Sequence, residues 1–265
     1  MKIPLFESLW ADYSRLNPQA GRIHGLFTDQ GETIVNDHIA LRTFDHPKLN
    51  IESLARHFND LGYVERDEYF FEAKNLRAKY YSGPEPDSPK VFISELIAHK
   101  HSLRLQKMIA SWVEGIDSQR ISDQKFLISG IHWPALAFSE YEAIRKESEY
   151  AAWLACFGFR VNHFTVSLNH FIKFSTIQDA NIFLKKNGFI LNGSGGEIKG
   201  SPAEGLMQSS TKAENVGVRF SDGMHPVPSC YYEFAQRFPD ETGNLFQGFL
   251  PDSADKIFES TDPNP

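Results

Sequence analysis

The 265-residue chain is 41% hydrophobic and 23% charged, which predicts a globular protein with a sizeable core. Its net charge of -7 argues against a broad nucleic-acid surface, and its two cysteines are too few for a disulfide framework or a thiolate zinc site. Acidic residues interrupt the N-terminal stretch where a signal peptide would be apolar, and no later stretch reaches membrane-span length, so we expect a cytoplasmic protein without nucleic-acid or membrane partners.

The first predicted strand covers residues 35–44 (VNDHIALRTF) and carries two unexpected polar side chains. Because side chains alternate along a strand, His38 and Arg42 share one face, and mostly apolar residues take the other. A histidine can bind a metal and an arginine can clamp a carboxylate, so this face suits a small substrate. The simpler alternative is a half-exposed strand with a solvated arginine and a hydrogen-bonded histidine.

Residues 160–168 (RVNHFTVSL) repeat this strand pattern. His163 takes the position of His38, and Asp37 is an extra residue in the first copy. A helical pattern that ends at a glycine follows each copy, at nearly the same distance from the histidine. The matched order and spacing indicate an internal duplication.

Three further strand patterns complete each repeat. They lie at residues 67–73, 76–83 and 90–98 in the first repeat, and at residues 195–201, 213–221 and 229–238 in the second. The sequence therefore predicts an α+β fold of two βαβββ modules in one domain that spans residues 1–265. We place the modules at about residues 32–101 and 159–250. Good helix formers between them predict a helical insertion at about residues 102–158.

The final strand of each module contains a glutamate, Glu95 in the first and Glu233 in the second. A glutamate amid apolar strand residues needs a partner, which raises the number of candidate metal ligands to four. His38, His163 and one carboxylate would form the facial triad suited to ferrous iron, whereas all four would suit a glyoxalase-type zinc or nickel centre. Pairing with a nearby arginine or lysine is the alternative for either glutamate.

A polar stretch, residues 208–211 (QSST), precedes the last strand of the second module. The amide of Gln208 and the hydroxyl of Ser209 are candidates to bind carboxylate oxygens of a substrate. A turn network that satisfies its own backbone is the alternative interpretation. The chain has no P-loop, dinucleotide-binding, serine-hydrolase or zincin motif.

Seven segments, in order over residues 32–237, resemble the DUF1338 family. They read NDHIALRTF, LGYVERDEYFFEAKNLRAKYY, PKVFISEL, VNHFTVS, EIKGSP, QSSTKAE and VPSCYYEFAQR. The characterised members of this family are 2-oxoadipate dioxygenase/decarboxylases. Their architecture is similar to that of the vicinal oxygen chelate enzymes, which are built from paired βαβββ units.

The resemblance implies a mononuclear Fe(II) enzyme that uses molecular oxygen to turn 2-oxoadipate into 2-hydroxyglutarate and CO2 in lysine catabolism. It assigns the metal triad to His38, His163 and Glu233 and substrate binding to Arg42, and these four form the expected catalytic set. Zinc or nickel could replace iron in purified protein, because metal affinity follows the Irving–Williams order. A glyoxalase-like lyase or isomerase that uses Glu95 as a fourth ligand, and a non-catalytic small-molecule-binding relative, remain as alternatives.

Overall fold

The computed structural model describes residues 4–261. The chain begins with helices α1 (Leu5–Leu16) and α2 (Pro18–Asp29). The first βαβββ run consists of β1 (Asn36–Phe44), α3 (Ile51–Asn59), β2 (Val64–Phe71), β3 (Leu76–Ser82) and β4 (Lys90–Leu96). The helical insertion contains α4 (Leu103–Glu114), α5 (Ser118–Ile121), α6 (Phe138–Glu147) and α7 (Glu149–Phe157). The second run and its end comprise β5 (Val161–Ser167), α8 (Ile177–Lys186), β6 (Lys199–Ser201), β7 (Leu206–Ser210), β8 (Asn215–Phe220), β9 (Gly223–Pro228), β10 (Tyr231–Arg237) and α9 (Pro251–Phe258).

An eight-stranded sheet joins the two runs in the order β2-β3-β4-β1-β5-β10-β7-β6. The first and last strands of each run, β1 with β4 and β5 with β10, pair in parallel. The two first strands, β1 and β5, pair antiparallel at the centre. Each half therefore has the same internal strand order, and the expected α+β fold of two βαβββ modules is confirmed.

One strand of the second module differs from the prediction. Residues 213–221 do not enter the main sheet, because β8 pairs with β9 in a separate two-stranded hairpin. The sheet position belongs instead to β7, which contains most of the polar stretch at residues 208–211 and was not predicted as a strand. All of β7 is buried, so it lacks the alternating pattern of a half-exposed strand, whereas β8 alternates because one of its faces is open to solvent.

The two module helices begin with the same kind of cap. The side chain of Asn50 accepts a hydrogen bond from the backbone N–H of Ser53 at the start of α3, and that of Thr176 accepts one from Asp179 at the start of α8. These caps satisfy a backbone donor that the first turn leaves free. Gly62, in the left-handed region at φ 86°, turns the chain after α3 as the sequence predicts.

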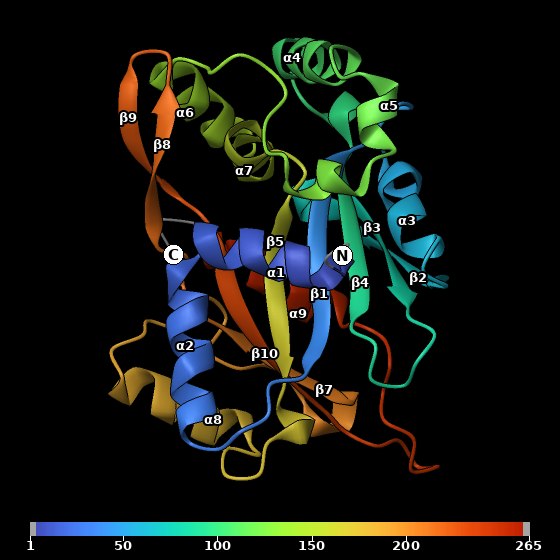
Figure 1. Ribbon diagram of the computed structural model, residues 1–265, viewed down its shortest axis with the longest axis vertical. Coiled ribbons are helices and arrows are strands. Elements are labelled where there is room, and N and C mark those ends of the chain that lie inside the picture. The colour runs from blue at the N-terminus through green and yellow to red at the C-terminus, as the bar shows by residue number, and fades with distance from the viewer. Residues whose placement is uncertain (1–3, 262–265) are drawn as a thin grey trace.

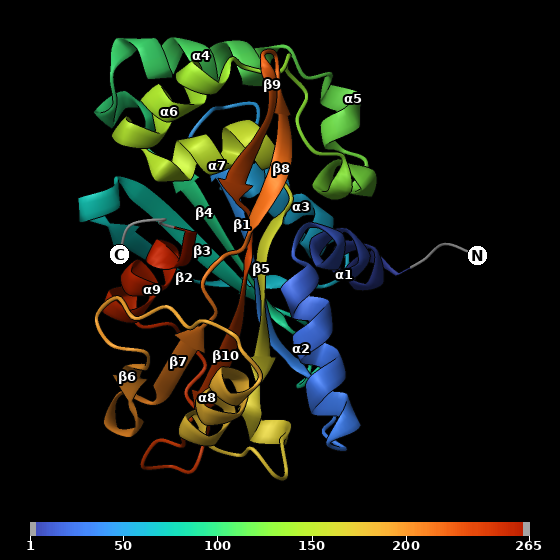
Figure 2. The same cartoon turned by 90° about the vertical axis from the view of Figure 1, so that its left-hand side faces the viewer.

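The main sheet separates two helical groups (Figures 1 and 2). Figure 2 shows α1 and α2 on one side of the sheet and α9 on the other. Helix α9 contacts β2 at one edge and β6 at the opposite edge, so the sheet curls around it. The insertion helices lie together at one end of the molecule (Figure 1). The sequence patterns did not predict α1, α2 or α9.

Within residues 4–261, no helix combines the length and the apolar character that a membrane crossing requires.

Candidate metal centre

Three central strands bring His38, His163 and Glu233 together on the sheet face that α9 covers. One ligand atom from each lies within 4.8 Å of the other two, and all three side chains are buried. Nε2 of His163 lies 3.2 Å from Oε2 of Glu233, and Nε2 of His38 lies 3.7 Å from Oε1. The register explains the convergence, because Glu233 and His38 both pair with Thr165 of β5. We call these three residues the His-His-Glu cluster.

The donor set of the cluster fits a divalent transition metal. Glu233 is completely buried, and a buried carboxylate is costly unless its charge is compensated. Its Oε1 accepts a hydrogen bond of 2.5 Å from Nε2 of Gln208, whereas Oε2 has no hydrogen-bond partner among the described residues. Two imidazole nitrogens and one carboxylate oxygen on one side of a site are typical ligands of non-haem iron. The cluster can therefore hold a metal ion.

Burial sets the protonation of the cluster. Burial, with smaller contributions from the neighbouring His38 and Arg42, holds the pKa of His163 well below its usual value, which favours the neutral ring. A neutral imidazole is the form that binds metal. Burial also raises the pKa of Glu233, although His38 and Gln208 act in the opposite direction. A metal ion would therefore compete with a proton for this carboxylate.

Arg42 is buried on the same face of β1 but outside the space enclosed by the cluster. Its guanidinium lies 4.9 Å from the ring centre of Tyr150, 5.2 Å from that of Trp153 and 5.7 Å from that of Phe258. It lines a cavity of about 210 Å³, whereas the cavity at the cluster measures about 20 Å³. A volume of about 20 Å³ has room for roughly one water molecule. Phe258 lines both cavities.

The two predicted polar contacts from β7 fall on opposite faces. Gln208 lies on the cluster face and bonds Glu233. Ser209, one residue further along, is buried on the other face, where its hydroxyl donates a 2.7 Å hydrogen bond to Oδ1 of Asn181 in α8. A strand reverses the direction of successive side chains, so Ser209 cannot reach a substrate at the cluster, and this part of our expectation was wrong.

Glu95 does not join the cluster. It pairs with Thr43 of β1, which places its side chain on the sheet face opposite to His38 and Arg42. Its carboxylate accepts a 2.7 Å hydrogen bond from Nη1 of Arg77 and a 3.0 Å bond from the backbone N–H of Ile51. The four-ligand centre that we kept as an alternative therefore lacks its fourth ligand.

Aromatic residues that the sequence analysis did not single out enclose the cluster. Tyr231 stacks on the ring of His163, with the ring centres 4.5 Å apart. The ring of Phe249 is perpendicular to that of His38, with the ring centres 4.8 Å apart. Phe258 and its neighbour Ile257, both on α9, complete the cover. In the sequence, the signal for the part of this cover on α9 is the apolar pair Ile257 and Phe258 at the end of a short and otherwise mostly polar helical pattern. This signal is too weak to connect the helix with a site.

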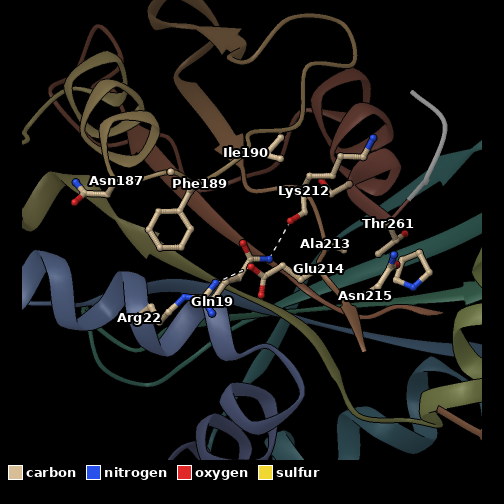
Figure 3. A pocket seen from close by; sticks show the side chains of 13 residues that line it. Gln19, Arg22, Asn187, Phe189, Ile190, Lys212, Ala213, Glu214, Asn215 and Thr261 are labelled. Atoms are coloured by element: carbon tan, nitrogen blue, oxygen red, sulfur yellow. Dashed lines mark hydrogen bonds and ion pairs between the residues drawn. The ribbon is translucent and has the colours of Figure 1, made fainter. Parts of the chain in front are cut away.

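A third cavity, of about 340 Å³, lies beside α2 (Figure 3). Several of its polar groups are already engaged, since Arg22 pairs with Glu214 at 2.6 Å and Nε2 of Gln19 donates to the backbone oxygen of Lys212 at 2.9 Å. It contains none of the predicted site residues.

A curled sheet of paired βαβββ modules with a buried His-His-Glu cluster on its inner face is a fold of the vicinal oxygen chelate type. A structure named a putative glyoxalase superfamily protein, from Ralstonia eutropha, has the same fold, with a TM-score of 0.76 at 19% identity over 92% of this chain and 84% of that chain. The family model described as 2-oxoadipate dioxygenase/decarboxylase matches residues 3–244. The chain therefore belongs to this family, as its sequence motifs predict.

More similar relatives support the family assignment. A rice (Oryza sativa subsp. japonica) 2-oxoadipate dioxygenase/decarboxylase, chloroplastic/amyloplastic, is 36% identical over 94% of this chain and 75% of its own length. The crystal structure of rice hydroxyglutarate synthase in complex with 2-oxoadipate matches with a TM-score of 0.92 at 35% identity, over 98% of this chain and 91% of that chain. A structure named a putative hydrolase, from Shewanella frigidimarina, matches with a TM-score of 0.88 at 48% identity, over 93% and 96%. The expectation of an enzyme of this family is confirmed.

Proposed function

We propose that this protein is an Fe(II)-dependent dioxygenase that converts 2-oxoadipate and O2 into 2-hydroxyglutarate and CO2. One carbon of the six-carbon acid leaves as CO2 and the other five form the hydroxy acid. The two products together contain two more oxygen atoms than the substrate and the same number of hydrogens. Both atoms of O2 therefore enter the products, and no further reductant is needed. The buried cluster, in which Oε2 of Glu233 accepts no hydrogen bond from the described residues, is the single observation that carries the proposal in a chain of this family. A role in lysine catabolism and a cytoplasmic location are part of the proposal.

We assign the iron to Nε2 of His38, Nε2 of His163 and the carboxylate of Glu233. A ferrous ion held by these three residues would supply a binding point for a 2-oxo acid and oxygen, and the redox chemistry that the reaction needs. Gln208 holds the carboxylate of Glu233 through its 2.5 Å hydrogen bond and keeps it aimed at the cluster. Zinc or nickel in purified protein is compatible with the same donors.

Arg42 is the proposed carboxylate clamp for the substrate. Three aromatic faces hold its guanidinium in place, so its donors are oriented before the substrate binds. A guanidinium can bind a carboxylate through two parallel hydrogen bonds, which suits a dicarboxylic 2-oxo acid. The substrate must displace Phe258, because the cavity of about 20 Å³ at the cluster is far smaller than a six-carbon acid.

Substrate-dependent oxygen consumption tests the proposal. Protein loaded with Fe(II) should consume oxygen with 2-oxoadipate, and a panel of other 2-oxo acids would define its specificity. His163→Ala should lose both stoichiometric iron and oxygen uptake, whereas His99→Ala, whose side chain is largely exposed outside the cluster, should lose neither. Retained turnover in His163→Ala, or turnover without oxygen, would reject the dioxygenase assignment.

A further inference from the structure

The two histidines of the cluster have different hydrogen-bond partners at Nδ1, a carboxylate for His38 and an amide for His163. We propose that Asp37 and Arg237 form a positioning pair that fixes the orientation of His38 and strengthens it as a metal ligand. This inference rests on the metal site proposed above. Neither Asp37 nor Arg237 belongs to the cluster itself.

A β-bulge places Asp37 next to His38. In the pairing of β1 with β5, Asn36 lies opposite Val166 and His38 opposite Thr165, which leaves Asp37 as an extra residue on β1. A bulge removes its extra residue from the normal alternation and redirects the neighbouring side chain. This residue is the one that interrupts the match between the two sequence repeats, so the first module has an acidic group that the second lacks.

The hydrogen bonds of Asp37 connect His38 to a buried arginine. Nδ1 of His38 lies 2.7 Å from Oδ1 of Asp37. Arg237 binds the same carboxylate with two donors, Nε to Oδ2 at 2.6 Å and Nη2 to Oδ1 at 2.9 Å. When the ring donates its Nδ1 proton to a carboxylate, the lone pair stays on Nε2, which faces the cluster, and the ring becomes a stronger donor.

The second module holds its histidine more weakly. Nδ1 of His163 lies 3.2 Å from Oδ1 of Asn162, a neutral amide. Hydrogen bonds to charged acceptors are shorter and stronger than those between neutral groups. The charged support of His38 is therefore a specific feature of the first module and not a general consequence of the fold.

Arg237 also anchors the segment that covers His38. Its Nη1 donates hydrogen bonds of 2.9 Å to the backbone oxygens of both Phe246 and Gly248. The guanidinium lies 5.4 Å from the ring centre of Phe249, whose edge meets His38. Arg237 thus orders both Asp37, which bonds Nδ1 of His38, and Phe249, which packs against the His38 ring.

Metal affinity, measured separately from turnover, tests this inference. The probe is Co(II), titrated against a competing chelator, with the visible absorption spectrum as a report on ligand geometry. Asp37→Asn should weaken Co(II) binding by roughly 10- to 100-fold and alter the spectrum, as expected for loss of a supporting carboxylate. Arg237→Lys, which keeps the charge but loses the fork, should change affinity in the same direction by a smaller factor.

Two further variants separate positioning from loss of stability. The double variant D37N/R237M removes both charges together, which folded proteins tolerate better than one unpaired buried charge, and it should bind Co(II) as weakly as Asp37→Asn. Arg77→Lys removes the guanidinium fork from an ion pair on the opposite sheet face and should leave Co(II) affinity and spectrum unchanged.

The outcomes distinguish this inference from the proposed function. Wild-type affinity and spectrum in both Asp37→Asn and D37N/R237M would overturn the positioning role and leave the metal site intact. A wild-type protein that binds no Co(II) at the cluster would overturn the metal site and this inference together.

Discussion

Residues that serve the cluster and residues that only stabilise the sheet differ by the face of the strand on which they lie. His38 and Arg42 face α9, whereas the adjacent Thr43 faces the other side, where Glu95 lies beside it in β4. The family resemblance selected Glu233 over Glu95, and the set of candidate ligands could be predicted from sequence because the duplication repeats the histidine and a glutamate within an apolar strand requires a partner. The pairing of Glu95 with Arg77 could not, because it depends on which strands are neighbours.

Arg42→Lys should keep the metal and lose substrate binding. Lysine retains the charge but has neither the fork that binds a carboxylate twice nor the plane that stacks on Tyr150 and Trp153. We expect oxygen uptake with 2-oxoadipate to fall by an amount equivalent to about 2–4 kcal/mol of productive binding. Iron content and steady-state oxygen kinetics measure the two effects. Unchanged kinetics would show that Arg42 does not touch the substrate.

Glu95→Gln should have the opposite outcome, with full metal content and a less stable fold. Glu95 accepts hydrogen bonds from Arg77 and from the first residue of α3, and a neutral amide weakens both. We expect the free energy of unfolding to fall by about 1–3 kcal/mol, measured by urea denaturation. Loss of iron in this variant, with the fold intact, would restore the four-ligand alternative.

At the scale of elements, the sequence predicted the repeated elements and the helical insertion, and missed the helices near the two ends of the described chain. β1, α3, β5 and α8 each have a counterpart, and agreement between the copies made them recognisable. Helix α9 has no counterpart, and it lies in the curl of the sheet because β2 and β6, far apart in sequence, both contact it. Long-range packing of this kind leaves little trace in a pattern of eight residues.

Phe258→Leu should open the passage between the two cavities on the inner face. Phe258 lines both the small cavity at the cluster and the larger one at Arg42, so a smaller side chain joins them. We expect longer 2-oxo acids to gain in kcat/KM relative to 2-oxoadipate. Oxygen uptake with a chain-length series measures this, and Phe27→Leu, in α2 on the opposite side of the sheet, is the control. An unaltered chain-length preference would show that Phe258 does not limit the site.

Glu32, between α2 and β1, connects the N-terminal helices to the second module in a pH-dependent way. Burial alone would raise its pKa, but backbone N–H groups of Ile172, Lys173 and Phe174 donate to its carboxylate and lower the pKa below the usual value. A carboxylate with a lowered pKa in the folded state contributes stability above its unfolded pKa of about 4.3. That contribution is lost as the pH falls through the folded pKa.

Glu32→Gln should therefore lower the free energy of unfolding at neutral pH by about 1–3 kcal/mol. The difference from wild type should shrink toward zero as the pH falls below about 4. Urea denaturation over this pH range, with the exposed Glu241→Gln as control, measures it. A difference that is independent of pH would show that packing of the side chain, and not its charge, is responsible.

At the scale of the whole molecule, the cluster lies where the two modules meet. His38 comes from β1 of the first half, and His163 and Glu233 come from β5 and β10 of the second. The antiparallel pairing of β1 with β5 makes one continuous sheet out of two halves, and the site sits across that junction. The duplication thus places one candidate histidine on the first strand of each module. The carboxylate of the cluster comes from Glu233 on β10, whereas the corresponding Glu95 on β4 faces the opposite side of the sheet.

Because the ligands come from both halves, a bound metal should act as a cross-link between the modules and stabilise the whole fold. An ion that binds only the folded protein, present at about 100 times its Kd, adds about 2.7 kcal/mol of stability. For a chain of this size that corresponds to a rise in Tm of roughly 5–10 °C. Calorimetry with and without Co(II) measures the rise, which Arg77→Lys should retain and His38→Ala or His163→Ala should each abolish. A rise that persists in either histidine variant would mean that the stabilising ion binds outside the cluster and does not cross-link the two modules there.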